Sequence, residues 1–220
     1  MKRALAVGML ALGLSGCAHH KKVANRVLPP PPLPLVGTTE TGLASWYGHP
    51  YDGRPAADGE VYNMETLVAA HRTLPFNTWV RVVNLDNSKS VDVRIIDRGP
   101  FVDGRIIDLS HAAAKAIDMI GPGTARVEVV VTRLPDVVLP GVFAVQVGAF
   151  RNRDNAERLR AEMQARYGVA RLVQRPESPG IWRVMVGAES TEDGADALSH
   201  RIQTESGEKN AFVVRLDSEG

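Results

Sequence analysis

The pattern of apolar and polar positions changes several times along the chain. Residues 4–14 form one uncharged apolar run. After it, short segments alternate apolar and polar positions, which is typical of half-buried β-strands. Such strands are expected at 42–47, 79–84, 90–96 and 125–132. Beyond residue 141, alternating strands give way to segments with helical spacing. The pattern therefore predicts a leader, an all-β domain and a smaller α+β domain.

The leader has the features of an export signal. Lys2 and Arg3 precede the apolar run, which is too short for a bilayer span of about 20 residues. Residues 1–16 therefore fit a cleaved secretory signal. The following Leu14-Ser15-Gly16-Cys17 resembles the lipobox of bacterial lipoproteins, in which the cysteine becomes lipidated. Because Cys17 is the only cysteine, an internal disulfide is excluded.

Two segments are expected to be linkers. Residues 17–41 include four consecutive prolines at 29–32, which favour an extended tether of about 3.1 Å per residue. Two prolines and a glycine interrupt the strand pattern within residues 134–142, which predicts a second linker at 134–140. The all-β domain is therefore predicted at 42–133 and the second domain at 141–217.

The second domain contains an internal repeat. Val145-Gln-Val-Gly-Ala recurs as Val184-Met-Val-Gly-Ala, and a helical pattern follows each copy. Two strand–helix–strand units predict a ferredoxin-like sandwich with both helices on one face of the sheet. Alternation places Trp182 toward the helices, with Gln146 and Arg183 on the opposite, open face. That face is either a ligand platform or simply solvated.

A candidate acid lies at the end of the strand predicted at 90–96. If alternation continues unbroken, Asp97 follows the core-facing row of Val91, Val93 and Ile95, and Arg98 points away. A carboxyl at an apolar mouth is partly desolvated, which favours a general acid. The pattern alone leaves open that Asp97 only caps the turn before Gly99.

Composition excludes several functions. Removal of residues 1–16 takes away Lys2 and Arg3, so 24 basic residues remain against 25 acidic ones, a formal charge of −1. That balance argues against a nucleic-acid partner. No spacing of histidine, aspartate and glutamate predicts a metal site, and no phosphate-binding loop or nucleophile elbow predicts a cofactor or an acyl-transfer enzyme.

Four motifs occur in an order that resembles the rare lipoprotein A family. They are Gly42-Leu-Ala-Ser-Trp-Tyr-Gly48, Gly59-Glu-Val-Tyr62, Asp97-Arg-Gly-Pro-Phe101 and Arg105-Ile-Ile-Asp-Leu-Ser110. The resemblance implies a six-stranded double-psi β-barrel and a lytic transglycosylase that leaves 1,6-anhydro ends on peptidoglycan. It also implies that Asp97 is the catalytic acid and that Glu60 and His71 belong to the site.

The carboxy-terminal repeat resembles the SPOR domain. The matching segments are Phe143-Ala-Val-Gln-Val-Gly-Ala-Phe150 and Trp182-Arg-Val-Met-Val-Gly187. The resemblance implies binding of glycan strands without stem peptides at division septa, with Gln146, Arg183 and Trp182 at or near binding positions. Ala18 stands where an aspartate retains many lipoproteins at the inner membrane, so the outer membrane is expected.

Two other functions stay open at this level. Expansin-like proteins share the double-psi barrel and loosen polysaccharide without hydrolysis. An inverting hydrolase would use a second carboxylate, such as Glu60, to activate water opposite Asp97. Three further polar residues are alternatives for the site: Asp103, Asp108 and His111. Among them, Asp108 is expected to cap the helix predicted at 110–117, with Ser110 available as its N-cap.

Overall fold

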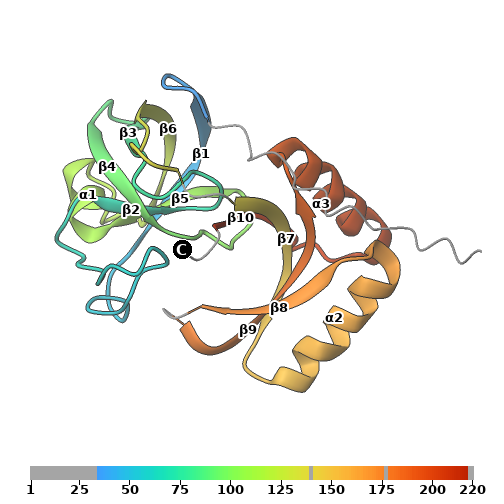
Figure 1. Ribbon diagram of the computed structural model, residues 1–220. Coiled ribbons are helices and arrows are strands. Elements are labelled where there is room, and N and C mark those ends of the chain that lie inside the picture. Colours follow the sequence, from blue (N-terminus) through green and yellow to red (C-terminus); the bar gives the residue numbers. More distant parts are fainter. Residues whose placement is uncertain (1–33, 139–140, 176–177, 218–220) are drawn as a thin grey trace, which may run out of the picture.

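The computed structural model describes residues 34–138, 141–175 and 178–217. The predicted signal, Cys17 and most of the first linker lie outside the described residues. The chain forms two lobes, a β-barrel and a sheet covered by two helices (Figure 1). The fold class is therefore the predicted combination of an all-β barrel and an α+β domain.

The first lobe is a closed six-stranded barrel. Its strands run in the order β1-β5-β2-β4-β3-β6, with parallel pairing between β1 and β5 and between β2 and β4. The elements are β1 (Thr39–Tyr47), β2 (Val68–His71), β3 (Trp79–Asn84), β4 (Ser90–Asp97), β5 (Arg105–Ser110), α1 (His111–Ala116) and β6 (Thr124–Arg133). Ser110 caps α1 as predicted, accepting a hydrogen bond from the Ala113 amide at 3.2 Å.

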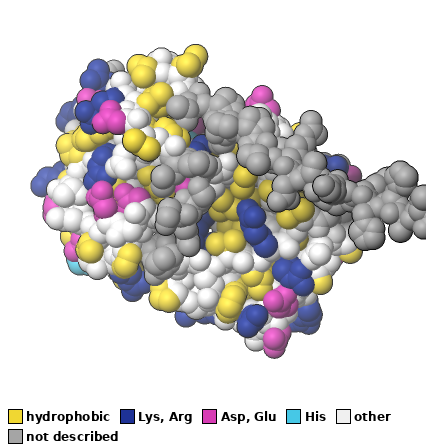
Figure 2. Space-filling view, viewed as in Figure 1, with side chains coloured by type: hydrophobic (Ala, Val, Ile, Leu, Met, Phe, Trp, Pro, Cys, Tyr) yellow, Lys and Arg dark blue, Asp and Glu magenta, His cyan; other side chains and the backbone are white. Residues whose placement is uncertain are grey.

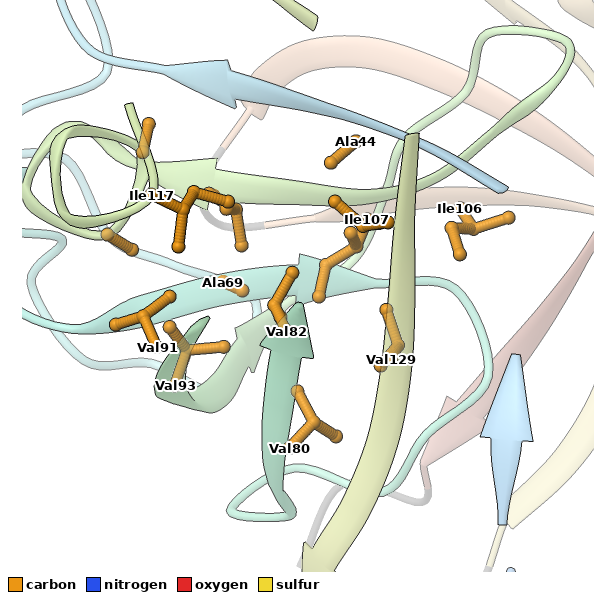
Figure 3. Packing of buried hydrophobic residues seen from close by; sticks show 14 of the residues in the cluster. Ala44, Ala69, Val80, Val82, Val91, Val93, Ile106, Ile107, Ile117 and Val129 are labelled. Atoms are coloured by element: carbon orange, nitrogen blue, oxygen red, sulfur yellow. The ribbon is translucent and has the colours of Figure 1, made fainter. Parts of the chain in front are cut away.

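Alternation fills the barrel with aliphatic side chains. Val80, Val82, Val93 and Ile107 are inaccessible to solvent and point into the space that the strands enclose (Figure 3). Their β-branched side chains fit a pleated, closely packed surface. The core makes the barrel a rigid support for groups on its outer face.

A β-bulge at Ile96 changes the expected direction of Asp97. Ala69 pairs with Ile95 and Ala70 pairs with Asp97, so Ile96 is an extra residue in β4. An extra residue breaks the two-residue alternation of side chains. Ile96 packs into a second cluster outside the barrel with Tyr62, and Asp97 shares a face with Ala70. The prediction that Asp97 continues the inward row of Val91, Val93 and Ile95 was therefore wrong.

The second lobe is a four-stranded antiparallel sheet in the order β10-β7-β9-β8. Its elements are β7 (Gly141–Phe150), α2 (Arg153–Tyr167), β8 (Ala170–Arg175), β9 (Ser178–Glu189), α3 (Glu192–Ser206) and β10 (Phe212–Asp217). Both helices lie on the sheet face away from the barrel (Figure 1). Trp182 packs against the helix-side core, as the alternation predicted.

The other face of this sheet is turned toward the barrel (Figure 1). Gln146 is 5% exposed and Arg183 is 8% exposed. The prediction that these two side chains lie on an open face was therefore wrong, because another part of the same chain covers that face.

In the described part of the chain, no helix is long and apolar enough to cross a membrane.

Candidate functional site

A row of paired residues crosses the outer face of the barrel. Ser45 on β1 pairs with Asp108 on β5, Asp108 pairs with Ala70 on β2, and Ala70 pairs with Asp97 on β4. Directly paired residues project to the same face of a sheet. Asp97 and Asp108 therefore flank Ala70, with their Cα atoms two strand spacings apart, or about 9.5 Å. Between them, Ala70 contributes only a methyl group to this face.

The segment between β1 and β2 folds over this row. The Asp58 amide donates to the carbonyl of Ile96 at 3.1 Å, and the Ala57 amide donates to Asp97 Oδ1 at 3.2 Å. The Arg98 amide donates to the same oxygen at 2.7 Å. Two backbone donors therefore fix the half-buried Asp97 carboxyl beneath this segment, at the end of a rigid strand.

Tyr47 adds a hydroxyl to the site. Its ring stacks on Tyr62 with the ring centroids 4.3 Å apart, and its enclosed hydroxyl has no hydrogen-bond partner among the described residues. Burial raises the pKa of Tyr47, and the charges of Asp97 and Asp108 raise it further. The phenol therefore keeps its proton at neutral pH. It is a hydrogen-bond donor that a bound ligand can use.

Asp108 is the second buried carboxyl of the row. Ser45 Oγ donates to Asp108 Oδ1, and Arg105 Nη1 donates to Ser45 Oγ at 3.2 Å. Burial raises the pKa of Asp108, while the Ser45 hydrogen bond and the Arg105 charge partly oppose that shift. Asp108 does not cap α1, since Ser110 takes that role. The expectation that Asp108 is a helix cap was therefore wrong.

Glu60 lies on the covering segment but its carboxylate is already paired. Arg94 donates to both carboxylate oxygens of Glu60, at 2.8 and 2.7 Å. These hydrogen bonds lower the pKa of Glu60, so the side chain is ionised at neutral pH. Asp58, next to it, has an Oδ2 atom that is buried without a hydrogen-bond partner in the described structure, 3.9 Å from Arg94 Nη1. Glu60 therefore anchors the segment and is unsuited to donate a proton.

Glu60→Gln should lower the turnover of the site by less than about tenfold. The exposed Glu60–Arg94 pair contributes about 0.2–1 kcal/mol, as exposed ion pairs do. Arg94→Gln also removes the hydrogen bond to Asn77 Oδ1, at 2.7 Å, so its effect should be equal or somewhat larger. The double variant should lose little more than Arg94→Gln alone, because both changes break the Glu60–Arg94 pair. Turnover measured for the four proteins tests this. A loss of about 10²-fold or more, the usual contribution of a general acid or base, would instead make Glu60 a second catalytic carboxylate.

His71 faces away from the row. It follows Ala70 on β2, so its side chain projects to the opposite face. Its Nδ1 atom accepts hydrogen bonds from the Thr73 and Leu74 amides at 3.2 and 3.1 Å, and its Nε2 atom lies 3.0 Å from Glu40 Oε2. Because Nδ1 is an acceptor, the ring proton is on Nε2. The structure therefore gives both ring nitrogens structural partners.

His71→Ala should lower the free energy of unfolding by about 1–3 kcal/mol, because two buried amides lose their acceptor. Urea unfolding measures this change. The exposed His200 on α3 provides the control, since His200→Ala should change stability by less than about 0.5 kcal/mol. An unchanged stability with lost turnover would contradict the structural role and place His71 at the substrate.

The remaining alternatives lie outside the row. The exposed Asp103 accepts a hydrogen bond from the Gly104 amide at 3.0 Å, and His111 Nδ1 contacts Glu65 Oε1 at 2.8 Å. Within residues 34–138, 141–175 and 178–217, no group of histidine, cysteine, aspartate and glutamate is arranged to hold a metal ion. The site therefore consists of carboxyl groups, hydroxyl groups and backbone amides.

Sequence reasoning missed Ser45, Tyr47 and Asp58. A signal existed for Tyr47, because Ser45 and Tyr47 alternate with the apolar Ala44 and Trp46. For Asp58 no alternation exists, since it lies in an irregular segment. Only the fold brings that segment over the end of β4.

Comparison with known proteins identifies both lobes. The lytic transglycolase family matches residues 39–129, and the SPOR domain family matches residues 139–215. The endolytic peptidoglycan transglycosylase RlpA of Campylobacter jejuni is 42% identical over 156 residues, which cover 60% of this chain and 57% of that protein. The RlpA of Helicobacter pylori strain J99 is 41% identical over 159 residues, which cover 59% and 51%.

A third relative is more similar to the chain over a shorter stretch. The RlpA of Pseudomonas aeruginosa strain PAO1 is 56% identical over 88 residues, covering 40% of this chain and 26% of that protein. The matched part of the chain thus spans about half the length of the first two relatives. Both domain matches follow the observed order of the lobes. The chain therefore belongs to the rare lipoprotein A (RlpA) family, with a double-psi β-barrel followed by a SPOR domain.

Proposed function

We propose that the chain is an endolytic lytic transglycosylase that cleaves the bond between N-acetylmuramic acid and N-acetylglucosamine in peptidoglycan. The observation that carries the proposal is the row on the barrel, in which Asp97 and Asp108 flank the small side chain of Ala70. Cleavage of a glycosidic bond needs a proton for the leaving oxygen and stabilisation of an oxocarbenium-like state. Two carboxyl groups on one rigid face supply groups for both tasks.

In the proposed reaction, Asp97 donates its proton to the glycosidic oxygen as the bond to the anomeric carbon breaks. The C6 hydroxyl of the same N-acetylmuramic acid attacks that carbon, and its proton passes to the Asp97 carboxylate. The product carries a 1,6-anhydro ring, no water is added, and Asp97 is restored. Asp108 would stabilise the positive charge that develops on the sugar. The Tyr47 hydroxyl would donate a hydrogen bond to the bound sugar.

Mass spectrometry of purified denuded glycan, after incubation with the protein, tests this proposal. Anhydro-ended fragments are the expected result. Fragments with added water would identify a hydrolase, and the absence of fragments would favour an expansin-like glycan-binding protein. Asp97→Asn protein is the control for contaminating activity.

One observation favours an inverting hydrolase as the second candidate. The Cα atoms of Asp97 and Asp108 lie about 9.5 Å apart, being separated by one strand. This spacing permits carboxyl groups about 6.5–9.5 Å apart, which leaves room for a water molecule as nucleophile. Fragment masses separate this candidate from the transglycosylase, because only hydrolysis adds water.

The SPOR domain would bring the barrel to its substrate. We propose that its sheet binds glycan strands without stem peptides at the septum, with Gln146 and Arg183 as contacts. Trp182 packs into the helix-side core, so its contribution would be to shape the sheet. Two glycan-binding lobes on one chain raise the local concentration of substrate at the barrel.

The amino terminus would anchor the chain in the envelope. We propose that Cys17 is lipidated, which places the protein at the outer membrane facing the periplasm. Cys17→Ser should release the protein from membranes without altering the lobes, because acyl chains contribute about 0.8 kcal/mol per buried CH₂. Fractionation after a carbonate wash tests this, with Ser15→Ala as the control. Membrane association that persists in Cys17→Ser would contradict lipidation.

A further inference from the structure

The segment that follows Asp97 joins the barrel to the SPOR domain. Arg98 Nη2 lies 2.6 Å from Asp217 Oδ2 on β10, and both side chains are largely buried. Arg98 Nη1 also donates to the carbonyls of His71 and Leu74, at 3.2 and 2.9 Å. The guanidinium therefore links the barrel end to the last strand of the SPOR sheet.

The contact continues through backbone and aromatic groups. The Arg215 amide on the edge strand β10 donates to the carbonyl of Arg72 at 3.0 Å. Phe101 lies edge-on to Phe212 with ring centroids 6.3 Å apart. The guanidinium of Arg175, on β8 at the other edge of the sheet, lies 5.5 Å from the Phe101 ring. The Asp97–Phe101 segment, which continues from the end of β4, therefore reaches across the helix-free face of the sheet.

The same face carries the residues proposed to bind glycan. Gln146 pairs with Phe212 on one side and with Met185 on the other, so the three side chains share this face. Met185 is inaccessible to solvent, and Gln146 and Phe212 are 5% and 7% exposed. In the space-filling view, hydrophobic and basic side chains gather where the two lobes meet (Figure 2). A glycan strand cannot reach these side chains while the lobes are in contact.

One buried group shows that the contact leaves a polar side chain unsatisfied. Gln146 Oε1 is buried without a hydrogen-bond partner within the described residues. A buried acceptor without a donor destabilises the arrangement that buries it. A glycan strand offers many hydroxyl donors. The covered face is therefore suited to a polar ligand, because the barrel does not supply a hydrogen-bond donor to Gln146 Oε1.

We propose that the barrel and the SPOR domain hold each other in a closed state, in which the Asp97–Phe101 segment shields the glycan-binding face. Glycan binding to the sheet and contact with the barrel are then mutually exclusive. A glycan strand that occupies the sheet separates the lobes and releases Arg98 beside the catalytic Asp97. This inference rests on the proposed function, since it takes a denuded glycan strand as the ligand of the sheet.

Binding of fluorescently labelled denuded glycan to the full chain tests the closed state. Asp217→Asn leaves the buried Arg98 without its carboxylate, and Phe101→Ala removes the ring from the other side of the contact. Each should tighten glycan binding at least about tenfold, because apparent affinity scales with the open fraction. Asp154→Asn on α2 and Val102→Ala, both at exposed positions, are the matched controls and should bind as the wild type does.

Amide hydrogen exchange at Arg215 supplies a second readout that needs no activity. Its amide bonds to Arg72 across the lobes, so exchange should accelerate in Asp217→Asn and, in the wild type, on addition of glycan. Equal glycan affinity of wild type and both interface variants would overturn the closed state and leave the proposed function standing. Weaker binding by the variants would overturn it in favour of one site shared by both lobes. If no variant binds denuded glycan, the proposed ligand of the SPOR domain fails as well.

Discussion

Asp97→Asn should lower the rate of glycan cleavage by about 10²–10⁴-fold, the usual contribution of a general acid and base. The asparagine carbonyl can still accept the Ala57 and Arg98 amides that now hold Asp97 Oδ1. The variant therefore keeps the geometry of the site and loses only the titratable proton. Its melting temperature should be unchanged or slightly raised.

The matched control for this prediction lies on the same strand. Asp92 on β4 is bound to the exposed Arg81, at 2.8 and 3.0 Å, away from the row. Asp92→Asn should leave turnover close to that of the wild type, since exposed ion pairs contribute little. Anhydro-product formation is the measurement for both variants. Near-normal turnover of Asp97→Asn would exclude it as the acid and transfer that role to Asp108 or Asp58.

The strands that could be predicted from the sequence are those with a clear alternation. Residues 80–82 of β3 and 90–95 of β4 alternate valine or isoleucine with polar residues, and the two strands were expected at nearly their observed bounds. By contrast, β2 is four residues long and buried throughout, and β5 alternates only over its last four residues, so both give a weak strand pattern. These two strands lie in the middle of the row that runs from Ser45 to Asp97. The resemblance to a family supplied the barrel that periodicity alone did not.

The direction of Asp97 could not be predicted because a bulge is a property of pairing. The adjacent Ile95 and Ile96 interrupt the alternation of β4, but only the register with β2 shows that Ile96 is the extra residue. The same limit applies to His71, whose acceptors become visible only when the chain turns back at Thr73 and Leu74. Sequence motifs identified Asp97, Glu60 and His71 together, while the fold separates their side chains.

The burial of Gln146 and Arg183 could not be predicted for a related reason. Alternation assigned Gln146 and Arg183 to the correct face of the sheet, opposite to the helices. What it could not supply is the neighbour of that face, because the contact joins Arg98 to Asp217 across most of the chain. Internal repeats determine the sandwich, whereas long-range contacts determine which of its surfaces meets solvent.

Asp108→Asn should lower turnover by about 10²–10³-fold, the size of effect seen when one preorganised charge-stabilising group is removed. In the proposed reaction, Asp108 must be ionised to stabilise the positive sugar. Because its pKa is raised, Asp108 should set the acidic limb of the pH–rate profile. Asp108→Asn should remove that limb.

Variants of the Asp108 partners should move the limb in a defined direction. The Ser45 hydrogen bond and the Arg105 charge both act to lower the pKa of Asp108. Ser45→Ala and Arg105→Gln should therefore raise that pKa and shift the acidic limb to higher pH. Turnover measured across the acidic range tests this, with Lys115→Gln on α1 as a charge control. A limb that stays in place in Ser45→Ala would show that another group sets it.

Stability should change with the opposite sign from turnover. A raised folded-state pKa means that the folded protein keeps the Asp108 proton to higher pH than the unfolded chain, whose ordinary value is 3.8. The stability from protonated Asp108 is then full below that value and declines as pH rises toward the folded-state pKa. Above its folded-state pKa the wild type carries an ionised, half-buried carboxylate, which Asp108→Asn lacks. The variant should therefore be as stable as the wild type, or more stable, at neutral pH, and should show no such decline.

Urea unfolding at acidic and neutral pH measures this difference in stability between Asp108→Asn and the wild type. If Asp108→Asn is less stable at neutral pH and inactive, its lost turnover reflects unfolding, and Asp108 has only a structural role.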